Sequence, residues 1–215
     1  MRWRQGEHVS LIGPTGTGKT TAMLGLLQQR RYVCVLGTKP ADETLSSLVQ
    51  RGGGYKRITA WPPPRVRERV VLWPRVTRAS DLPRIAGIMR HALDEAFAEG
   101  GWCIAADEVW FLSHKLKLAD MLETYWSQGR SIGLTLVATT QRPAWVPRMM
   151  YSQATHLFLW RDADRTNLDR IKDITSGALN SGDIRQIVGS LAKHEALYLN
   201  TRTGAMARTT APKRR

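Results

Sequence analysis

The sequence predicts an α/β fold in which a mostly parallel central sheet is covered by helices on both faces. Short apolar runs alternate with segments of helical length along most of the 215 residues, and this alternation is typical of parallel strands joined by crossover helices. A glycine-rich turn at 13–20 stands between one such run and one such segment. With 42% hydrophobic residues the chain can bury a full core. We therefore expect one domain over 1–201, followed by a basic tail over 202–215 that can be disordered.

Each expected strand is an apolar run of five or six residues: 8–12, 32–36, 68–73, 102–106, 134–138 and 155–160. The expected helices cover 18–29, 81–98, 116–128 and 163–172. Asp81 is a suitable N-cap for the second helix, with Pro83 in the first turn and Gly100 at the end. A late hairpin that begins with 196–200 can extend one edge of the sheet. Three glycines and three prolines within 51–66 exclude a central strand there, so this segment is expected to be an exposed loop.

The formal charge is strongly positive, and removing the tail's five basic residues from +14 still leaves +9. A basic body favours a polyanionic partner, either nucleic acid or an anionic membrane surface, and the alternative is an arginine-rich surface that is merely solvated. Cys34 and Cys103 lie in apolar runs without metal-ligand spacing, so we expect core thiols in a reducing compartment. No run approaches the ~18 apolar residues of a membrane span. These observations predict a cytoplasmic protein that no segment anchors in a membrane.

The turn Gly13-Pro14-Thr15-Gly16-Thr17-Gly18-Lys19-Thr20 fits the pattern G-x-x-x-x-G-K-[S/T], and Thr21 follows it into the first helix. Such glycines let backbone N–H groups point at the β- and γ-phosphates of ATP, and the helix N-terminus adds its dipole. We expect Lys19 to reach the terminal phosphates and the Thr20 hydroxyl to hold Mg²⁺. A strand before the turn and a helix after it make a chance match the weaker interpretation.

A second anchor for magnesium stands at the end of the apolar run 102–106. There Asp107 is expected to accept a hydrogen bond from a magnesium-bound water, and Glu108 to polarise the water that attacks the γ-phosphate. An acidic residue directly after the magnesium aspartate favours hydrolysis over transfer of the phosphoryl group to a second substrate. The alternative for this pair is a helix cap or a solvated acidic surface.

Polar residues end the strand expected at 134–138, where Gln141 follows two threonines. Ligands of α/β sheets bind at the carboxyl ends of the strands. If this strand neighbours the one that carries Asp107, Gln141 can bond to the γ-phosphate or to the attacking water and sense hydrolysis. The alternative is an ordinary loop amide.

An arginine that stabilises the transition state can come from the same chain or from a neighbouring subunit. Arg130 ends a helix just before the strand at 134–138, and this position near the surface suits donation into a neighbour's site. A helix-end charge or a surface salt bridge is the alternative. Arg142, Arg148 and Arg161 remain further candidates.

The segments GPTGTGKTT, WCIAADE and QGRSIGLTLVATTQRP, followed by a strand that ends at Trp160-Arg161, resemble the FtsK/HerA superfamily of DNA-pumping ATPases over 8–172. The resemblance implies a RecA-like (ASCE) P-loop NTPase that forms a ring of five or six copies around double-stranded DNA, with ATP between subunits. The isolated chain can still be a monomer. Matched by position, Lys19 and Thr20 fall on the family's first ATP-binding motif, Asp107 and Glu108 on its second, and Gln141 on the end of its sensor strand.

The chain has no room for the membrane spans and winged helix of FtsK or for the barrel of HerA, and in size it is more similar to the genome-packaging ATPases of double-stranded DNA viruses. This implies an ATP-driven translocase that packages or transfers a viral or mobile-element genome in the host cytoplasm, with a portal or capsid protein as a further partner. The alternatives are an ATPase that powers phage assembly or protein secretion without acting on DNA, and a P-loop kinase for a small molecule.

A motor that moves DNA of any sequence needs phosphate contacts and no base reading. The basic residues of the 51–66 loop are the first candidates: Arg51, Lys56 and Arg57, with Arg65 beside them. Lys115 and Lys117, beyond the strand that precedes Asp107, are the second. Solvated loops are the alternative for both groups, and the eight tryptophans of the chain have no assigned role.

Overall fold

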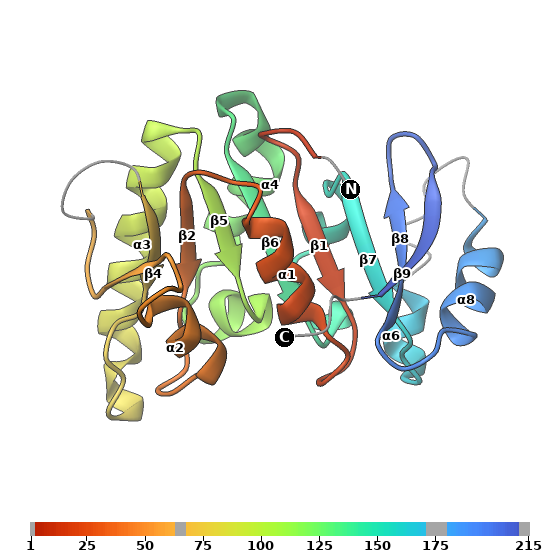
Figure 1. Cartoon of the computed structure of the whole chain (residues 1–215), viewed down its shortest axis with the longest axis horizontal. Coiled ribbons are helices and arrows are strands. Elements are labelled where there is room, and N and C mark those ends of the chain that lie inside the picture. The colour runs from red at the N-terminus through yellow and green to blue at the C-terminus, as the bar shows by residue number, and fades with distance from the viewer. Residues whose placement is uncertain (1–2, 63–67, 171–179, 211–215) are drawn as a thin grey trace.

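One sheet runs through the whole molecule (Figure 1). In the computed structural model, which describes residues 3–62, 68–170 and 180–210, the strand order is β3-β4-β2-β5-β6-β1-β7-β8-β9. The strands are β1 Val9–Ile12, β2 Val33–Leu36, β3 Lys56–Ile58, β4 Arg69–Leu72, β5 Cys103–Ala106, β6 Thr135–Thr140, β7 His156–Trp160, β8 Glu195–Asn200 and β9 Met206–Thr210. The strands from β3 to β7 in this order are parallel, and β8 and β9 are antiparallel. The predicted mostly parallel sheet is confirmed.

Helices cover both faces of this sheet, as predicted (Figure 1). The helices are α1 Lys19–Leu27, α2 Glu43–Val49, α3 Leu82–Glu99, α4 Ala119–Gln128, α5 Met149–Ser152, α6 Arg165–Asp169 and α8 Ser181–Gly189. Strand β2 shows how the two layers arise: Val33 and Val35 pack with α1, whereas Cys34 and Leu36 pack with α3 and α4. Side chains of a strand alternate between faces, so a run that is apolar throughout makes two cores.

Burial tests the prediction made for the two cysteines. Cys34 and Cys103 are buried and form no disulfide, and burial raises the pKa of both thiols to about 12. They are core thiols, as expected. No helix within the described residues is both long and apolar enough to cross a bilayer.

The segment 51–66 differs from the exposed loop that was expected. Residues 56–58 form β3, which pairs with β4 in the register Lys56↔Val70, and Ile58 and Trp61 are buried. The strand lies at the edge of the sheet, where neighbouring glycines and prolines do not interrupt a central ladder. Residues 63–67, including Arg65, lie outside the described residues.

The helix that begins near Asp81 is capped differently from the prediction. The Asp81 carboxylate accepts hydrogen bonds from the backbone N–H groups of Thr77 and Arg78 at 2.8 and 2.9 Å and makes no side-chain cap on α3. A short 3₁₀ turn at Ala79–Asp81 precedes the helix, and the carboxylate satisfies the donors just before that turn. Pro83 does lie in the first turn of α3, and Gly100 ends the helix.

The expected late hairpin is present, because β8 and β9 pair in the register Glu195↔Thr210. The described part of the segment 202–215 therefore forms a turn and an edge strand, and 211–215 lie outside the described residues. The helices α2, α5 and α8 were not predicted. We call the edge at which the parallel strands end the carboxyl edge, and the opposite one the amino edge.

Candidate functional site

The glycine-rich turn follows β1 at the carboxyl edge and leads directly into α1. A Cβ on Gly13 would lie 2.6 Å from Trp160 Cβ, and Gly18 has φ 106° at the N-cap of α1. Both positions therefore require glycine. Lys19 is 6% exposed, and its ammonium donates a hydrogen bond to the Pro14 carbonyl at 2.7 Å, which holds the side chain across the turn.

Asp107 stands directly after β5, which pairs with β6 in the register Ala106↔Ala138, so the condition set for Gln141 is met. Its Oδ1 accepts a hydrogen bond from the Thr139 hydroxyl at 2.9 Å and from the Thr20 hydroxyl at 3.4 Å. Hydroxyl and carboxylate oxygens are ligands that Mg²⁺ prefers, so Thr20 and Asp107 fit the predicted metal position. The described residues contain no cluster of three or more acidic, histidine or cysteine side chains suited to a metal, so phosphate and water oxygens would supply the remaining ligands.

Lys39 is a member of this site that the sequence analysis missed. Its ammonium lies 3.5 Å from Asp107 Oδ2 and 3.1 Å from Asp42 Oδ2. Burial acts to lower the pKa of Lys39, but the Asp107 and Asp42 carboxylates outweigh it and the pKa is raised. The residue follows β2 at the carboxyl edge, so the rule that ligands bind at strand ends could have identified it.

Glu108 has an uncommon backbone conformation for a non-glycine residue, with φ 68°. That conformation costs about 1 kcal/mol or more, and it is held by a 3.1 Å hydrogen bond from the Glu108 N–H to the Thr139 hydroxyl. The carboxylate accepts a 3.4 Å bond from the Thr140 hydroxyl. Burial raises the pKa of Glu108, and the negative charge of Asp107 adds to the increase. This backbone conformation directs the Glu108 carboxylate, with its raised pKa, into the site.

Gln141 lies against the glycine-rich turn, because its Oε1 accepts a 2.7 Å hydrogen bond from the Thr15 hydroxyl. The two residues are 126 positions apart in the sequence. β6 and β1 are neighbours in the sheet, with Thr140 opposite Ile12, so their carboxyl ends bring the turn and Gln141 together. Gln141 thus lies beside the turn, and its expected contact with the γ-phosphate or the attacking water stays a prediction.

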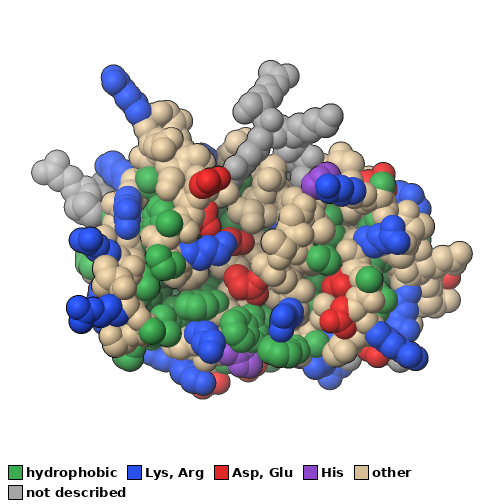
Figure 2. Space-filling view, turned by 90° about the horizontal axis from the view of Figure 1, so that it is seen from below, with side chains coloured by type: hydrophobic (Ala, Val, Ile, Leu, Met, Phe, Trp, Pro, Cys, Tyr) green, Lys and Arg blue, Asp and Glu red, His purple; other side chains and the backbone are tan. Residues whose placement is uncertain are grey.

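One cleft of about 900 Å³ at the carboxyl edge is lined by Thr15, Lys19, Thr20, Lys39, Asp107, Glu108, Thr139 and Gln141. Lys193, His194 and Thr210 also line it. His194 Nδ1 lies 3.3 Å from the Thr17 carbonyl oxygen. These three residues were not predicted from the sequence, since they do not follow a parallel strand. β8 is antiparallel to β7, so the start of β8 and the end of β9 meet the carboxyl ends of the other strands. Seen from this edge in Figure 2, acidic side chains lie near the centre and basic ones surround them.

Comparison with known proteins supports the same fold. No protein-family model matches the chain, and no curated protein does. The genome packaging NTPase B204 of Sulfolobus turreted icosahedral virus 2, in complex with ATP-gammaS, aligns with a TM-score of 0.66 at 16% identity, over 98% of this chain and 100% of that one. The chain has the fold of a P-loop NTPase. The resemblance drawn from the motifs is confirmed at the level of the fold.

Two larger ATPase structures contain the same P-loop fold. EssC (ATPases 2 and 3) from Geobacillus thermodenitrificans aligns with a TM-score of 0.63 at 13% identity, over 99% of this chain and 41% of that one. The pCW3 conjugation coupling protein TcpA aligns with a TM-score of 0.57 at 14% identity, over 96% and 60%. The fold is thus found both as a whole chain and as part of longer chains.

Arg130 lies at the edge of the sheet opposite the cleft of its own chain. It precedes β6 in the 3₁₀ turn Gly129–Ile132, so it stands at the amino edge, where it is exposed. Its positive charge helps to lower the pKa of His8, just before β1. Arg130 therefore cannot serve its own site. Arg142 lies at the carboxyl edge, with its guanidinium 4.9 Å from the Trp145 ring centroid.

The basic residues proposed for DNA contact fall into two separate groups. Lys56 forms a 2.7 Å ion pair with Glu68, and the Arg57 guanidinium stacks 4.4 Å from the Trp73 ring centroid and donates to the Trp73 carbonyl. Lys115 and Lys117 are exposed beyond β5 at the carboxyl edge. Arg51 is exposed in the turn after α2. The structure does not bring the two groups together.

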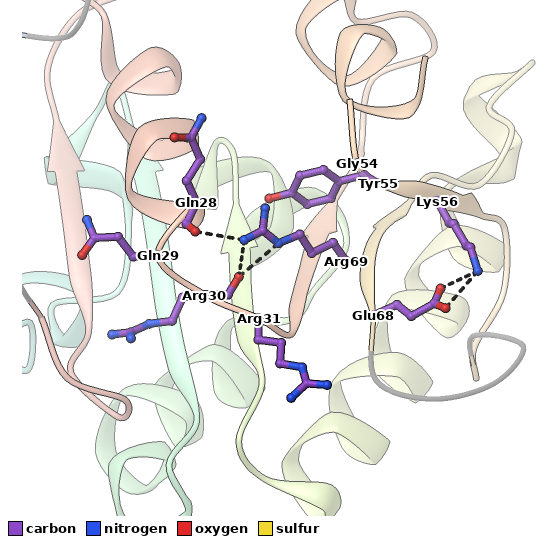
Figure 3. A pocket seen from close by; sticks show the side chains of 9 residues that line it. All are labelled: Gln28, Gln29, Arg30, Arg31, Gly54, Tyr55, Lys56, Glu68 and Arg69. Atoms are coloured by element: carbon purple, nitrogen blue, oxygen red, sulfur yellow. Dashed lines mark hydrogen bonds and ion pairs between the residues drawn. The ribbon is translucent and has the colours of Figure 1, made fainter. Parts of the chain in front are cut away.

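A second pocket, of about 790 Å³, lies at the amino edge, away from the P-loop (Figure 3). Lys56 and its partner Glu68 line one side of it. Arg69 donates to the carbonyls of Gln28 and Arg30 at 2.9 and 2.7 Å, so its guanidinium fastens the α1–β2 loop (Figure 3). Two of the basic residues around this pocket are thus already engaged in holding the fold.

Proposed function

We propose that the chain is an ATP hydrolase that drives movement of double-stranded DNA, in the packaging or transfer of a viral or mobile-element genome. One observation supports the hydrolase activity: two hydrogen-bonded pairs of side chains lie in one cleft. The Thr20 hydroxyl donates to Asp107, and the Thr15 hydroxyl donates to Gln141. These pairs join the P-loop to the ends of β5 and β6, where the other proposed catalytic residues lie.

The proposed reaction is in-line attack of water on the γ-phosphate of ATP. Backbone N–H groups of the P-loop cradle the β- and γ-phosphates, and the Lys19 ammonium leaves the Pro14 carbonyl to neutralise their charge. When bound between Thr20 and Asp107, Mg²⁺ supplies further neutralisation of the phosphates. Glu108 polarises the attacking water and takes its proton, for which a raised pKa is suited. Gln141 contacts the γ-phosphate or the water and loses that contact once phosphate departs.

The DNA part of the proposal is supported by the match with B204 over nearly the full length of both chains, since B204 is described as a genome packaging NTPase. The net charge of +14 also suits a polyanion. Contacts that do not depend on DNA sequence would come from Lys115 and Lys117 at the carboxyl edge and from Arg51 beside β3. Lys56 and Arg57 would have to leave Glu68 and Trp73 to join them.

The proposal includes a ring of copies, because Arg130 stands at the edge opposite the cleft of its own chain. A subunit whose amino edge faced a neighbour's cleft would place Arg130 near the neighbour's γ-phosphate. Such an arginine stabilises the charge of the transition state and raises turnover by a factor of about 10³ or more. A dilute monomer would then hydrolyse ATP slowly.

ATP turnover across a series of protein concentrations, with and without linear duplex DNA, tests the proposal. We expect turnover per chain to rise with protein concentration and to rise again with duplex. Turnover per chain that is constant and indifferent to duplex would contradict a DNA motor and would favour an ATPase for protein assembly or secretion. A phosphorylated small molecule formed in proportion to ADP would favour a kinase.

A further inference from the structure

The tryptophans divide into two groups by exposure. Six of the eight are buried, at 6% exposure or less: Trp3, Trp61, Trp73, Trp102, Trp126 and Trp160. Trp145 is 50% exposed, and Trp110 is half-buried. Both of these stand at the carboxyl edge, in the loops that follow β5 and β6. A half-exposed indole gains less from burial than one in the core, so packing alone does not account for Trp145.

Trp110 and Trp145 form one cluster with three basic side chains, here called the tryptophan patch: Trp110, His114, Lys115, Arg142 and Trp145. The two indole rings lie 6.3 Å apart at 52°. The Lys115 ammonium lies 5.6 Å from the Trp110 ring centroid and the Arg142 guanidinium 4.9 Å from that of Trp145. His114 Nε2 lies 2.6 Å from the Trp145 carbonyl oxygen, which ties the two loops together. Figure 2 shows hydrophobic and basic side chains side by side on this face.

The charges of the patch are available to a partner. None of the ion pairs found within the described residues involves Lys115 or Arg142. Aromatic faces interleaved with unpaired cations are the arrangement by which proteins bind unpaired nucleotides, with bases stacked on the rings and phosphates on the cations. A duplex hides its base faces and presents only phosphates, sugars and base edges, so the indoles favour a single strand.

We propose that the tryptophan patch binds single-stranded DNA, with a base stacked on Trp145 and phosphates paired with Arg142 and Lys115. This inference rests on the proposed function, since it names a second form of DNA for the same motor. A single strand arises at the end of a duplex or at a gap, which such a motor meets when it engages or leaves its substrate.

The patch is joined to the catalytic carboxylate by one hydroxyl. Thr140 Oγ1 accepts a 3.1 Å hydrogen bond from the Arg142 N–H and donates a 3.4 Å bond to Glu108 Oε1. Glu108, Trp110, Gln141 and Arg142 also line a common cavity of about 320 Å³. A strand that moves Arg142 therefore acts on the group that polarises water, and ATP turnover should respond to single-stranded DNA.

The proposal is tested by measuring how the full chain, without ATP, binds a labelled oligothymidylate of about 20 nucleotides. Fluorescence anisotropy gives the affinity. Trp145→Ala should weaken binding about tenfold, the loss expected when one stacked base is removed, and Trp145→Phe should restore most of it. Arg142→Gln should reduce the slope of log affinity against log salt by about 0.7, the value for one phosphate contact on a single strand. Met206→Ala, which removes another exposed side chain (44%) on β9, should bind like wild type.

Equal affinity of wild type and Trp145→Ala would overturn the proposal, as would an equal loss in Met206→Ala. The same variants with a duplex should differ little, and a tenfold loss there as well would contradict preference for a single strand. If Trp145→Ala changed only self-association in sedimentation, the patch would be an interface between copies and the proposal would be wrong. Duplex-stimulated ATP turnover is a separate readout, so failure of the DNA motor and failure of the patch are distinguishable.

Discussion

The Thr15 hydroxyl donates a 2.7 Å hydrogen bond to Gln141 Oε1 and so joins the P-loop to the end of β6. The γ-phosphate of ATP would enter between these two side chains. Its arrival should break or lengthen the bond, and its departure should restore it. A contact of this kind can report hydrolysis to the residues that follow Gln141.

The Thr15–Gln141 bond can be measured by a double-mutant cycle with Thr15→Val and Gln141→Ala. We expect the two effects on nucleotide affinity to be non-additive by about 0.5–1 kcal/mol, the range of a neutral hydrogen bond between exposed side chains. Thr15→Val combined with Thr124→Val, an exposed threonine of α4, should be additive. Additivity in the first cycle would show that the bond has no energetic role.

Glu108→Gln should leave nucleotide affinity within a few fold of wild type and lower turnover by a factor of about 10²–10⁴, the contribution of a general base. The amide keeps the shape of the side chain but cannot take a proton from water. Nucleotide affinity and turnover should be measured on the same preparation, with Glu95→Gln on the exposed face of α3 as the control. A variant that retained more than about a tenth of wild-type turnover would remove Glu108 from the proposed mechanism.

The pH range in which kcat/KM is high should be narrowed at both its acidic and its basic end. The parameter kcat/KM reports the pKa values of the free enzyme's essential groups. Burial raises the pKa of Glu108 above its ordinary value of 4.5, so activity should be lost at a higher pH than for an ordinary carboxylate as the pH falls. Burial lowers the pKa of Lys19 below 10.5, so activity should also be lost earlier as the pH rises. Glu108→Gln should abolish the acidic limb in its residual activity. An acidic limb that persisted unchanged would assign it to another group.

His8 should make the stability of the protein depend on pH. Burial, aided by the charges of Arg202 and Arg130, lowers the pKa of His8 from 6.5 to about 4. The unfolded chain then binds more protons between these values. The contribution of His8 is therefore present above pH 6.5 and is lost as the pH falls towards 4, at up to about 1.4 kcal/mol per pH unit.

Urea unfolding between pH 4 and 7 measures this dependence. His8 Nδ1 accepts a 3.0 Å hydrogen bond from the Leu136 N–H, and asparagine can offer an oxygen at the same place. His8→Asn should fold and should show a flatter profile, whereas His91→Asn, at an exposed position on α3, should keep the wild-type slope. Equal slopes for His8→Asn and wild type would assign the pH dependence to other groups.

The site residues that follow parallel strands could be predicted from the sequence, because ligands of such sheets bind at the carboxyl ends of the strands. Asp107, Gln141 and the P-loop each follow an apolar run, and parallel strands end at one edge. The same rule applied to β2 would have added Lys39. His194 escaped it, since that residue precedes a strand, and the direction of β8 depends on tertiary pairing that no local pattern encodes.

The edges of the sheet were harder to predict than its centre. Strand β3 has three residues, two of them exposed and basic, so it lacks the apolar run that marks the central strands. Its place is fixed by Ile58 and by Trp61, which packs on Trp102 with ring centroids 5.1 Å apart. These contacts span about 40 positions and depend on the folded neighbour. Pairing of this kind cannot be read from the segment itself.

Arg130 offers a test of the shared site, because it and Glu108 lie at opposite edges of one chain. If each active site takes Glu108 from one subunit and Arg130 from the next, Glu108→Gln and Arg130→Ala should each be nearly inactive. A mixture of the two contains pairs in which an Arg130→Ala subunit supplies Glu108 and a Glu108→Gln subunit supplies Arg130. Turnover of the mixture should therefore exceed that of either variant alone, at the same total protein concentration and with duplex DNA.

Arg31→Ala is the matched control, since Arg31 is also an exposed arginine at the amino edge, just before β2. It should retain wild-type turnover, and mixing it with Glu108→Gln should only dilute activity. A mixture of Arg130→Ala and Glu108→Gln that gave no more than the average of its parts would rule out Arg130 as the residue that acts on a neighbour. Arg148 and Arg161 would then be the arginines to exchange in the same assay, since the complementation depends on which edge meets the neighbour's cleft.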